Sequence, residues 1–229
     1  MNYSHLLFDL DGTIFDYDRA ESEALKRTFS EFGIRYLHSS LAAYRKINRQ
    51  IWKDYESGMI TQSDLKRERF RRLGEALAIE IVPDQFGACY LNYLSQGRFL
   101  IPGVLGLLNG LRRDGYKMYI ITNGLKDVQR ARLNGSEITG FFSDIFISGE
   151  IGSAKPDRAI FDEAFGRMGA PDRRKVLLIG DSLSSDIAGG SAYGMDTCWY
   201  NPDRAENRSG HTPVFVIHDI RELSVLLEP

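Results

Sequence analysis

Cysteine is scarce in this chain, and long apolar runs are missing altogether. The two cysteines, Cys89 and Cys198, are far apart and stand in no spacing typical of a metal site, which argues against a disulfide framework. The four histidines are scattered and indicate no zinc site. No apolar stretch approaches the ~20 residues that span a bilayer. We therefore expect no disulfides, no zinc and no membrane partner.

An excess of charge of one sign is lacking as well. Lysine and arginine number 29 against 31 aspartates and glutamates, for a net charge of −2. A surface that binds a nucleic-acid polymer usually shows a basic excess, so we expect no such partner. The N-terminal residues lack the basic segment and apolar run of a signal peptide, and we expect a cytoplasmic protein. No feature of the sequence indicates an oligomeric state.

What the chain does contain is an alternation of short apolar runs with helical patterns. Continuous apolar runs of this length are typical of strands buried on both faces, and here they lie at 6–8, 118–121, 145–147, 176–179, 197–200 and 214–217. Helical stripes stand between most of them, as at Leu107, Leu108 and Leu111. Strands that alternate with helices predict an α/β fold with a doubly wound parallel sheet.

The segment 16–98 breaks this alternation and predicts an inserted all-helical domain. Asp18 and Glu21 have the spacing of a capping box at the start of a first helix. A second helical stripe ends near Gly58, a third begins near Thr61, and a fourth follows Pro83. The residues on either side, 1–15 and 99–229, then form the α/β domain.

Polar clusters follow four of the predicted strands, where open α/β sheets bind their ligands. The first is Asp9-Leu10-Asp11-Gly12-Thr13. Two carboxylates two residues apart point to the same side of an extended chain and repel each other unless a cation lies between them. Asp-Gly is also common in plain turns. An EF-hand loop is excluded, because its sixth and twelfth positions here are Ile14 and Ala20.

The second and third clusters are weaker signals taken singly. Thr122-Asn123-Gly124 offers a hydroxyl and backbone N–H groups that can hold an anionic oxygen, but Asn-Gly alone is more often a turn. Lys155 precedes Pro156, and a lone lysine is usually a solvated surface charge. Both clusters indicate a functional site only in combination with the other two.

The fourth cluster runs from Gly180-Asp181 to Asp186 after the strand 176–179. Two carboxylates at this position suit a hard cation such as Mg²⁺, which prefers oxygen ligands. An equally simple interpretation makes Asp181 or Ser182 the cap of the following helix.

In this order, the four clusters resemble the four motifs of the haloacid dehalogenase superfamily. The resemblance extends over the whole chain, and the segment 16–98 is similar to that superfamily's helical cap of the first type. It implies a Rossmann-like catalytic core and a magnesium-dependent phosphatase that acts on small phosphate monoesters through an aspartyl-phosphate.

The resemblance assigns a role to each motif residue. Asp9 would be the nucleophile, and Asp11 would protonate the leaving oxygen and later deprotonate the attacking water. Lys155 would neutralise negative charge on Asp9 and the phosphate. The Thr122 side chain and the N–H of Asn123 would hold the phosphoryl oxygens.

Magnesium would be the cofactor in this scheme. Its ligands would be Asp9, the backbone carbonyl of Asp11, and Asp181, with Asp186 close by or joined through a water molecule.

Two further stretches are similar to the pyrimidine 5'-nucleotidase subgroup, namely 15–21 and 180–202. Gly12 is a small departure, because many members of that subgroup lack a glycine there. This similarity predicts a 5'-nucleotidase that prefers pyrimidine nucleoside monophosphates. The aromatic side chains of the cap would either pack its core or stack on a base: Tyr44, Trp52, Tyr55, Tyr90 and Tyr93.

Several rival interpretations use the same scaffold, and the motif residues argue against two of them. A sugar-phosphate phosphatase or a phosphomutase would use the same motifs, whereas a dehalogenase would need no acid at Asp11. A catalytically silent binding protein would have no use for the complete set of Asp9, Asp11, Lys155 and Asp181.

Overall fold

The computed structural model describes residues 3–228 and divides the chain into two compact units. One unit comprises Met1–Tyr17 and Arg98–Pro229, and the other Asp18–Gly97. These limits lie within two residues of those expected from the sequence. Both cysteines are free thiols.

The larger unit contains a six-stranded parallel sheet with the strand order β3-β2-β1-β4-β5-β6. The strands confirm all six predicted apolar runs: β1 (His5–Phe8), β2 (Lys117–Thr122), β3 (Asp144–Ile147), β4 (Val176–Gly180), β5 (Asp196–Tyr200) and β6 (Phe215–Ile217). The chain builds the sheet outward from β1 in one direction and then from β4 in the other. Such a reversal opens a crevice at the carboxyl ends of the two central strands.

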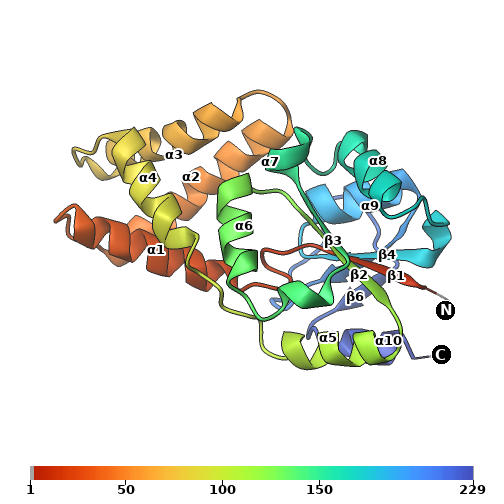
Figure 1. The fold of residues 1–229 in the computed structure, drawn as a ribbon. Helices are drawn as coiled ribbons and strands as arrows, with labels where there is room; N and C mark the ends of the chain where they lie inside the picture. Colours follow the sequence, from red (N-terminus) through yellow and green to blue (C-terminus); the bar gives the residue numbers. More distant parts are fainter. Residues whose placement is uncertain (1–2, 229) are drawn as a thin grey trace. The chain divides into compact units, whose positions relative to one another are not determined.

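Helices cover both faces of this sheet (Figure 1). Leu6 and Phe8 pack toward α5 (Val104–Arg113) and α10 (Glu222–Leu226), because alternate residues of a strand face opposite sides. Leu7 packs toward α8 (Arg158–Arg167) and α9 (Ala188–Tyr193) on the other face. This burial on both faces explains why the strands are apolar throughout.

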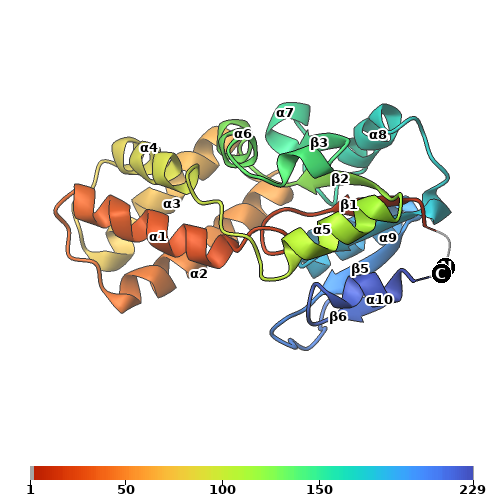
Figure 2. The ribbon, with the colours of Figure 1, turned by 60° about the horizontal axis from the view of Figure 1, so that its bottom comes forward.

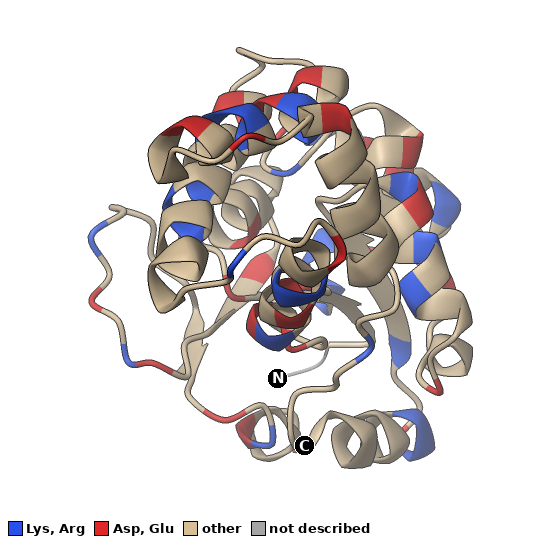
Figure 3. Cartoon of the chain, turned by 90° about the vertical axis from the view of Figure 1, so that its left-hand side faces the viewer, with Lys and Arg blue, Asp and Glu red and all other residues tan. Residues whose placement is uncertain are grey.

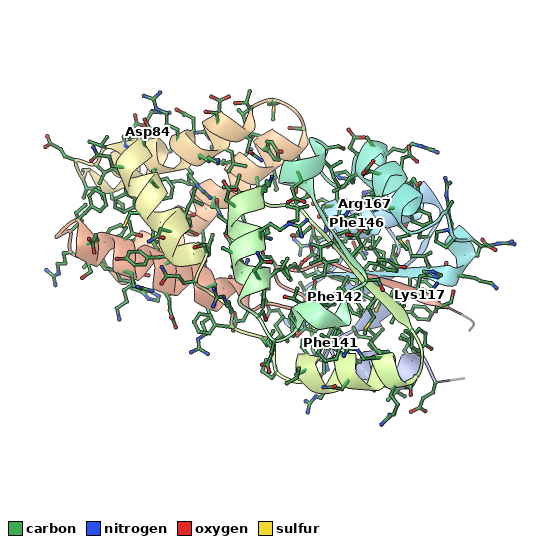
Figure 4. All side chains as sticks on the ribbon, in the orientation of Figure 1. Asp84, Lys117, Phe141, Phe142, Phe146 and Arg167 are labelled. Atoms are coloured by element: carbon green, nitrogen blue, oxygen red, sulfur yellow. The ribbon has the colours of Figure 1, made fainter. Side chains whose placement is uncertain are left out.

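Shorter elements complete the larger unit. They are α6 (Lys126–Asn134), α7 (Ser148–Ile151), two 3₁₀ turns (Thr139–Phe141 and Arg173–Lys175) and a π-helical turn (Leu183–Ile187). Figure 2 shows β5 and β6 near α10 at one edge of the sheet. Figure 4 shows Arg167 of α8 close to Phe146 of β3, with the guanidinium carbon 4.9 Å from the ring centroid.

The smaller unit is all helical, with α1 (Tyr17–Glu31, whose first residue belongs to the larger unit), α2 (His38–Glu56), α3 (Gln62–Leu77) and α4 (Pro83–Leu94). Thr61 caps α3 and forms a capping box with Asp64. The capping box expected at Asp18 was wrong: α1 begins at Tyr17, so Asp18 lies inside the first turn. Glu21 instead accepts hydrogen bonds from Arg45 and Asn48 of α2, because its carboxylate points into the bundle.

An aromatic cluster forms the core of the helical unit. Tyr44 and Tyr90 are fully buried, and each lies against Phe70, with ring centroids 5.8 and 5.3 Å away. These two tyrosines are therefore packing residues. Trp52 and Tyr55 are only half-buried and contact each other edge to face.

Charged residues of both signs are interspersed along the helices of both units (Figure 3). Among residues 3–228, no helix is long and apolar enough to cross a membrane.

Candidate active site

The four polar clusters meet at the carboxyl ends of three neighbouring strands. Asp9 directly follows β1, Thr122 is the last residue of β2, and Asp181 directly follows β4. Because β2, β1 and β4 are adjacent and parallel, their ends bring these side chains to one edge of the sheet.

Lys155 is the positive charge at the centre of this site. Its ammonium donates to Asp9 Oδ1 at 2.7 Å, to Asp186 Oδ1 at 2.6 Å and to the Ile121 carbonyl at 2.8 Å. Its side chain is 1% exposed. Burial by itself would lower the pKa of Lys155, but the attraction of Asp186 and Asp9 outweighs it and raises that pKa. The ammonium is therefore a fixed charge that neutralises part of the acidic site.

The side chain of Asn123 holds the loop that carries Lys155. Its Nδ2 donates to the Lys155 carbonyl and its Oδ1 accepts from the Lys155 N–H, both at 2.8 Å. Two bonds to the backbone of one residue, one to its N–H and one to its C=O, fix both the position and the direction of the loop. Sequence reasoning considered only the backbone N–H of Asn123 and missed this role of its amide.

Three carboxylates form a cluster beside the lysine. One oxygen each from Asp9, Asp181 and Asp186 lies within 4.8 Å of the others. Burial raises the pKa of Asp9, and the neighbouring Asp186 adds to this against the opposing effect of Lys155. Burial also raises the pKa of Asp181, with further contributions from Asp9 and Asp186. Asp181 as a whole residue is exposed to solvent, whereas protein atoms surround its carboxyl group. When all three carboxylates are ionised, their negative charge therefore exceeds what Lys155 alone neutralises.

A magnesium ion fits this set of donors. Asp9 Oδ2 is buried, and within residues 3–228 it accepts no hydrogen bond, which is costly for a carboxylate oxygen unless a cation binds it. Carboxylate oxygens are also the ligands that Mg²⁺ prefers. Asp186 uses one oxygen for Lys155 and the other for the N–H of Ser182, at 3.0 Å. Asp9 and Asp181 are therefore the better candidates for direct ligands.

The position of Asp181 depends on two residues from other strand ends. Gly12 has a φ of +88°, and a Cβ atom there would lie 2.6 Å from Asp181 Oδ2. Only glycine combines this backbone conformation with such a close approach. The indole Nε1 of Trp199, at the end of β5, donates to the Asp181 carbonyl at 2.8 Å. Sequence reasoning did not assign Trp199 to the site.

Asp11 pairs with two side chains of α6. Its Oδ1 accepts from Arg132 Nη1 at 2.5 Å, and its Oδ2 accepts from Gln129 Nε2 at 2.8 Å. The metal contact expected through the Asp11 carbonyl stays a prediction. Sequence reasoning also missed Gln129 and Arg132; two polar residues three apart on the helix after Thr122 were the available signal.

The fold and the site together define an α/β protein whose acidic cluster and buried lysine lie at the switch point of a parallel sheet. The family model of haloacid dehalogenase-like hydrolases matches residues 3–194. The chain belongs to this family.

Relatives within the family match the chain over nearly its whole length. The chain is 34% identical to the pyrimidine 5'-nucleotidase YjjG of Escherichia coli, over 99% of both proteins. It is 34% identical to the pyrimidine 5'-nucleotidase PynA of Streptococcus pneumoniae, over 97% of this chain and 94% of that protein.

A solved structure shows the same fold. The putative HAD-hydrolase YfnB of Bacillus subtilis is 35% identical over the full length of both chains, with a TM-score of 0.94. That protein was crystallised bound to magnesium, and its structure reveals interdomain movement.

Replacing Lys155 by methionine tests the electrostatic role of the buried ammonium. Lys155→Met leaves the carboxylates of Asp9 and Asp186 buried without their cation, so the free energy of unfolding should fall by about 3–5 kcal/mol in metal-free buffer. Denaturant titration measures this loss. Lys117→Met, at the opposite end of β2 from Thr122 (Figure 4), removes an exposed lysine and should change stability by less than about 0.5 kcal/mol. Equal small losses in both variants would contradict the assignment.

Proposed function

We propose that this protein is a magnesium-dependent phosphatase that hydrolyses small phosphate monoesters through an aspartyl-phosphate on Asp9. The observation that carries the proposal is the environment of the Asp9 carboxylate. One oxygen is fixed by Lys155, while the other is buried and accepts no hydrogen bond within residues 3–228. Such a carboxylate can bind a cation through one oxygen and form the bond to phosphorus through the other.

The phosphate dianion repels a carboxylate nucleophile, and the site must cancel that repulsion. Lys155 supplies one fixed positive charge next to Asp9. A magnesium ion held by Asp9, Asp181 and the carbonyl of Asp11 would supply further positive charge for the phosphoryl oxygens. Thr122, 1% exposed at the end of β2, would donate its hydroxyl proton to one of these oxygens.

In the first half of the reaction, an oxygen of Asp9 attacks phosphorus and the bond from phosphorus to the leaving oxygen breaks. Asp11 gives its proton to that oxygen, so the product leaves as a neutral alcohol. In the second half, a water molecule attacks phosphorus and the bond to Asp9 breaks. Asp11 takes the proton of that water, and the site returns to its starting state with phosphate released.

The nucleophile is tested by Asp9→Asn. The amide keeps the shape of the side chain but cannot form the acyl phosphate, so turnover of p-nitrophenyl phosphate should fall by about a thousandfold or more. Asp203→Asn, at an exposed aspartate of the larger unit, should retain full activity. Substantial turnover by a folded Asp9→Asn variant would refute the nucleophile. If the unchanged protein turned over no phosphate ester with magnesium, a catalytically silent binding protein would be the better interpretation.

Removal of the metal tests the acidic cluster. Excess chelator should abolish activity, and added Mg²⁺ should restore it, because Lys155 alone cannot neutralise Asp9, Asp181 and the phosphate. Ca²⁺ should inhibit, since it accepts looser and higher coordination than octahedral Mg²⁺. Phosphate release with and without each ion measures both effects. Full activity in excess chelator would rule out the metal site.

The substrate class that we infer is nucleoside 5'-monophosphates, with pyrimidines preferred. The full-length similarity to two pyrimidine 5'-nucleotidases supports this. So do the half-buried aromatic rings of Trp52 and Tyr55 in the helical unit, because base stacking on an aromatic ring contributes roughly 1–3 kcal/mol. We also propose that the helical unit acts as a lid, which favours a small monoester over a nucleic-acid polymer. The cytoplasmic location stays a prediction.

A substrate panel tests this preference. At matched concentrations, UMP, dUMP or dTMP should show a kcat/KM roughly ten- to a hundredfold higher than hexose phosphates or phosphoglycolate, by the magnitude of one stacking contact. Phosphate release across the panel gives the ranking. Should any non-nucleotide phosphate rank about tenfold above every pyrimidine monophosphate, the nucleotide assignment fails and a sugar-phosphate phosphatase is favoured, while the phosphatase chemistry stands.

A further inference from the structure

Two polar side chains of α6 are buried beside the site without a part in the chemistry described so far. Gln129 is 1% exposed and Arg132 is 0% exposed, although arginine and glutamine are mostly surface residues. They stand three residues apart and share one face of α6 (green in Figure 1). This helix follows the loop after Thr122, so its first turns lie close to the ends of β1 and β2.

Their hydrogen bonds form a closed network around Asp11. Arg132 Nη1 donates to Asp11 Oδ1 at 2.5 Å and to Gln129 Oε1 at 3.0 Å. Gln129 Nε2 donates to Asp11 Oδ2 at 2.8 Å and to Thr122 Oγ1 at 3.0 Å. The amide of Gln129 has only one orientation here, because a flip would set its NH₂ against the guanidinium and its oxygen against the carboxylate.

We propose that Gln129 and Arg132 are positioning residues for the reaction: they hold the Asp11 carboxyl group and the Thr122 hydroxyl in the relative arrangement that proton transfer to the leaving oxygen requires. This inference rests on the phosphatase function proposed above.

The network leaves both groups free to act. A carboxyl group has about four lone-pair sites, of which Arg132 and Gln129 use one on each oxygen, so Asp11 can carry a proton without losing either bond. Thr122 Oγ1 is an acceptor toward Gln129, which leaves its own proton available for a phosphoryl oxygen. Gln129 thus couples the group that handles the leaving oxygen to the group that holds the phosphate.

The close approach of the Gln129 side chain to Gly124 is a second indication that this side chain is held in one position. A Cβ atom at position 124 would lie 2.7 Å from Gln129 Cγ, 2.8 Å from Nε2 and 2.9 Å from Cδ. Real Cβ atoms do not approach so closely, and Gln129 cannot yield without breaking its bonds to Asp11 and Thr122. The glycine of the Thr122-Asn123-Gly124 motif therefore makes room for the Gln129 amide.

A purely structural role is the competing explanation. The Arg132 guanidinium lies 4.7 Å from the centroid of the buried Phe15 ring, so it also fills space, and Asp11 could serve only as its counter-ion. The two explanations predict different losses of activity for different leaving groups when the network is removed. A structural defect lowers the rate with every substrate alike, whereas a misplaced acid matters only when the leaving oxygen needs a proton.

The test compares kcat/KM for two substrates in Gln129→Leu, Arg132→Met and Gly124→Ala. UMP, or the fastest alkyl phosphate of the panel, has a poor leaving group that requires a proton. The p-nitrophenolate ion leaves without one. We expect kcat/KM for the alkyl phosphate to fall by about a hundredfold or more, as loss of general acid catalysis does. For p-nitrophenyl phosphate we expect a loss of no more than about tenfold, from the weaker hold on Thr122.

Arg130→Met is the matched control. Arg130 lies on the same helix but pairs with Glu150, at 2.6 Å, and its side chain is 35% exposed. Its removal should leave the activities with both substrates unchanged. Gln129→Leu and Gly124→Ala should have a Tm close to that of the unchanged protein, and Mg²⁺ should raise the Tm by a similar amount. These two variants keep the test valid if Arg132→Met does not fold.

The outcomes separate this inference from the proposed function. Equal losses with both substrates, or no loss with either, would overturn the positioning role while the unchanged protein still acts as a phosphatase. Absence of turnover in the unchanged protein would overturn the proposed function itself. A selective loss with the alkyl phosphate in all folded variants would support the inference.

Discussion

The ion pairs of Lys155 with Asp9 and Asp186 are the contact on which the rest of the site depends. A buried ammonium is stable only where acceptors surround it, and here those acceptors come from the ends of three strands: Asp9 after β1, the Ile121 carbonyl on β2, and Asp186 beyond β4. Lys155 itself is held by the amide of Asn123. One charge thus ties four loops together, and it does so at the point where the strand order reverses.

The carboxylate charge that Lys155 does not neutralise favours the binding of a metal cation. Lys155 neutralises one of the three carboxylates, and a buried oxygen of Asp9 accepts no hydrogen bond within residues 3–228. A site with this excess of carboxylate charge favours the binding of a cation that prefers oxygen ligands. The bound cation in turn favours the binding of an anion with several oxygens. The electrostatics therefore favour phosphate chemistry before any particular substrate is considered.

The roles that we propose for the two aspartates of the first motif agree with their different surroundings. Asp9 lies among carboxylates and the lysine, whereas Asp11, two residues later, lies among the donors of α6. Loops between strands and helices vary freely without changing the sheet. A helix that follows the second strand can thus shape the environment of a residue that follows the first.

The sequence alone determined the α/β class, the six buried strands and the identity of the residues at their ends, because apolar runs and the residues that end them are local features. It also indicated that a helix begins near Thr61. Only the tertiary structure decided which side chains meet. Gln129, Arg132 and Trp199 looked like ordinary helix and strand residues, and Glu21 was read as part of a capping box that the helix does not form. Their partners lie far away in the sequence, and such contacts arise only when the strands take their order in the sheet and the helices pack around them.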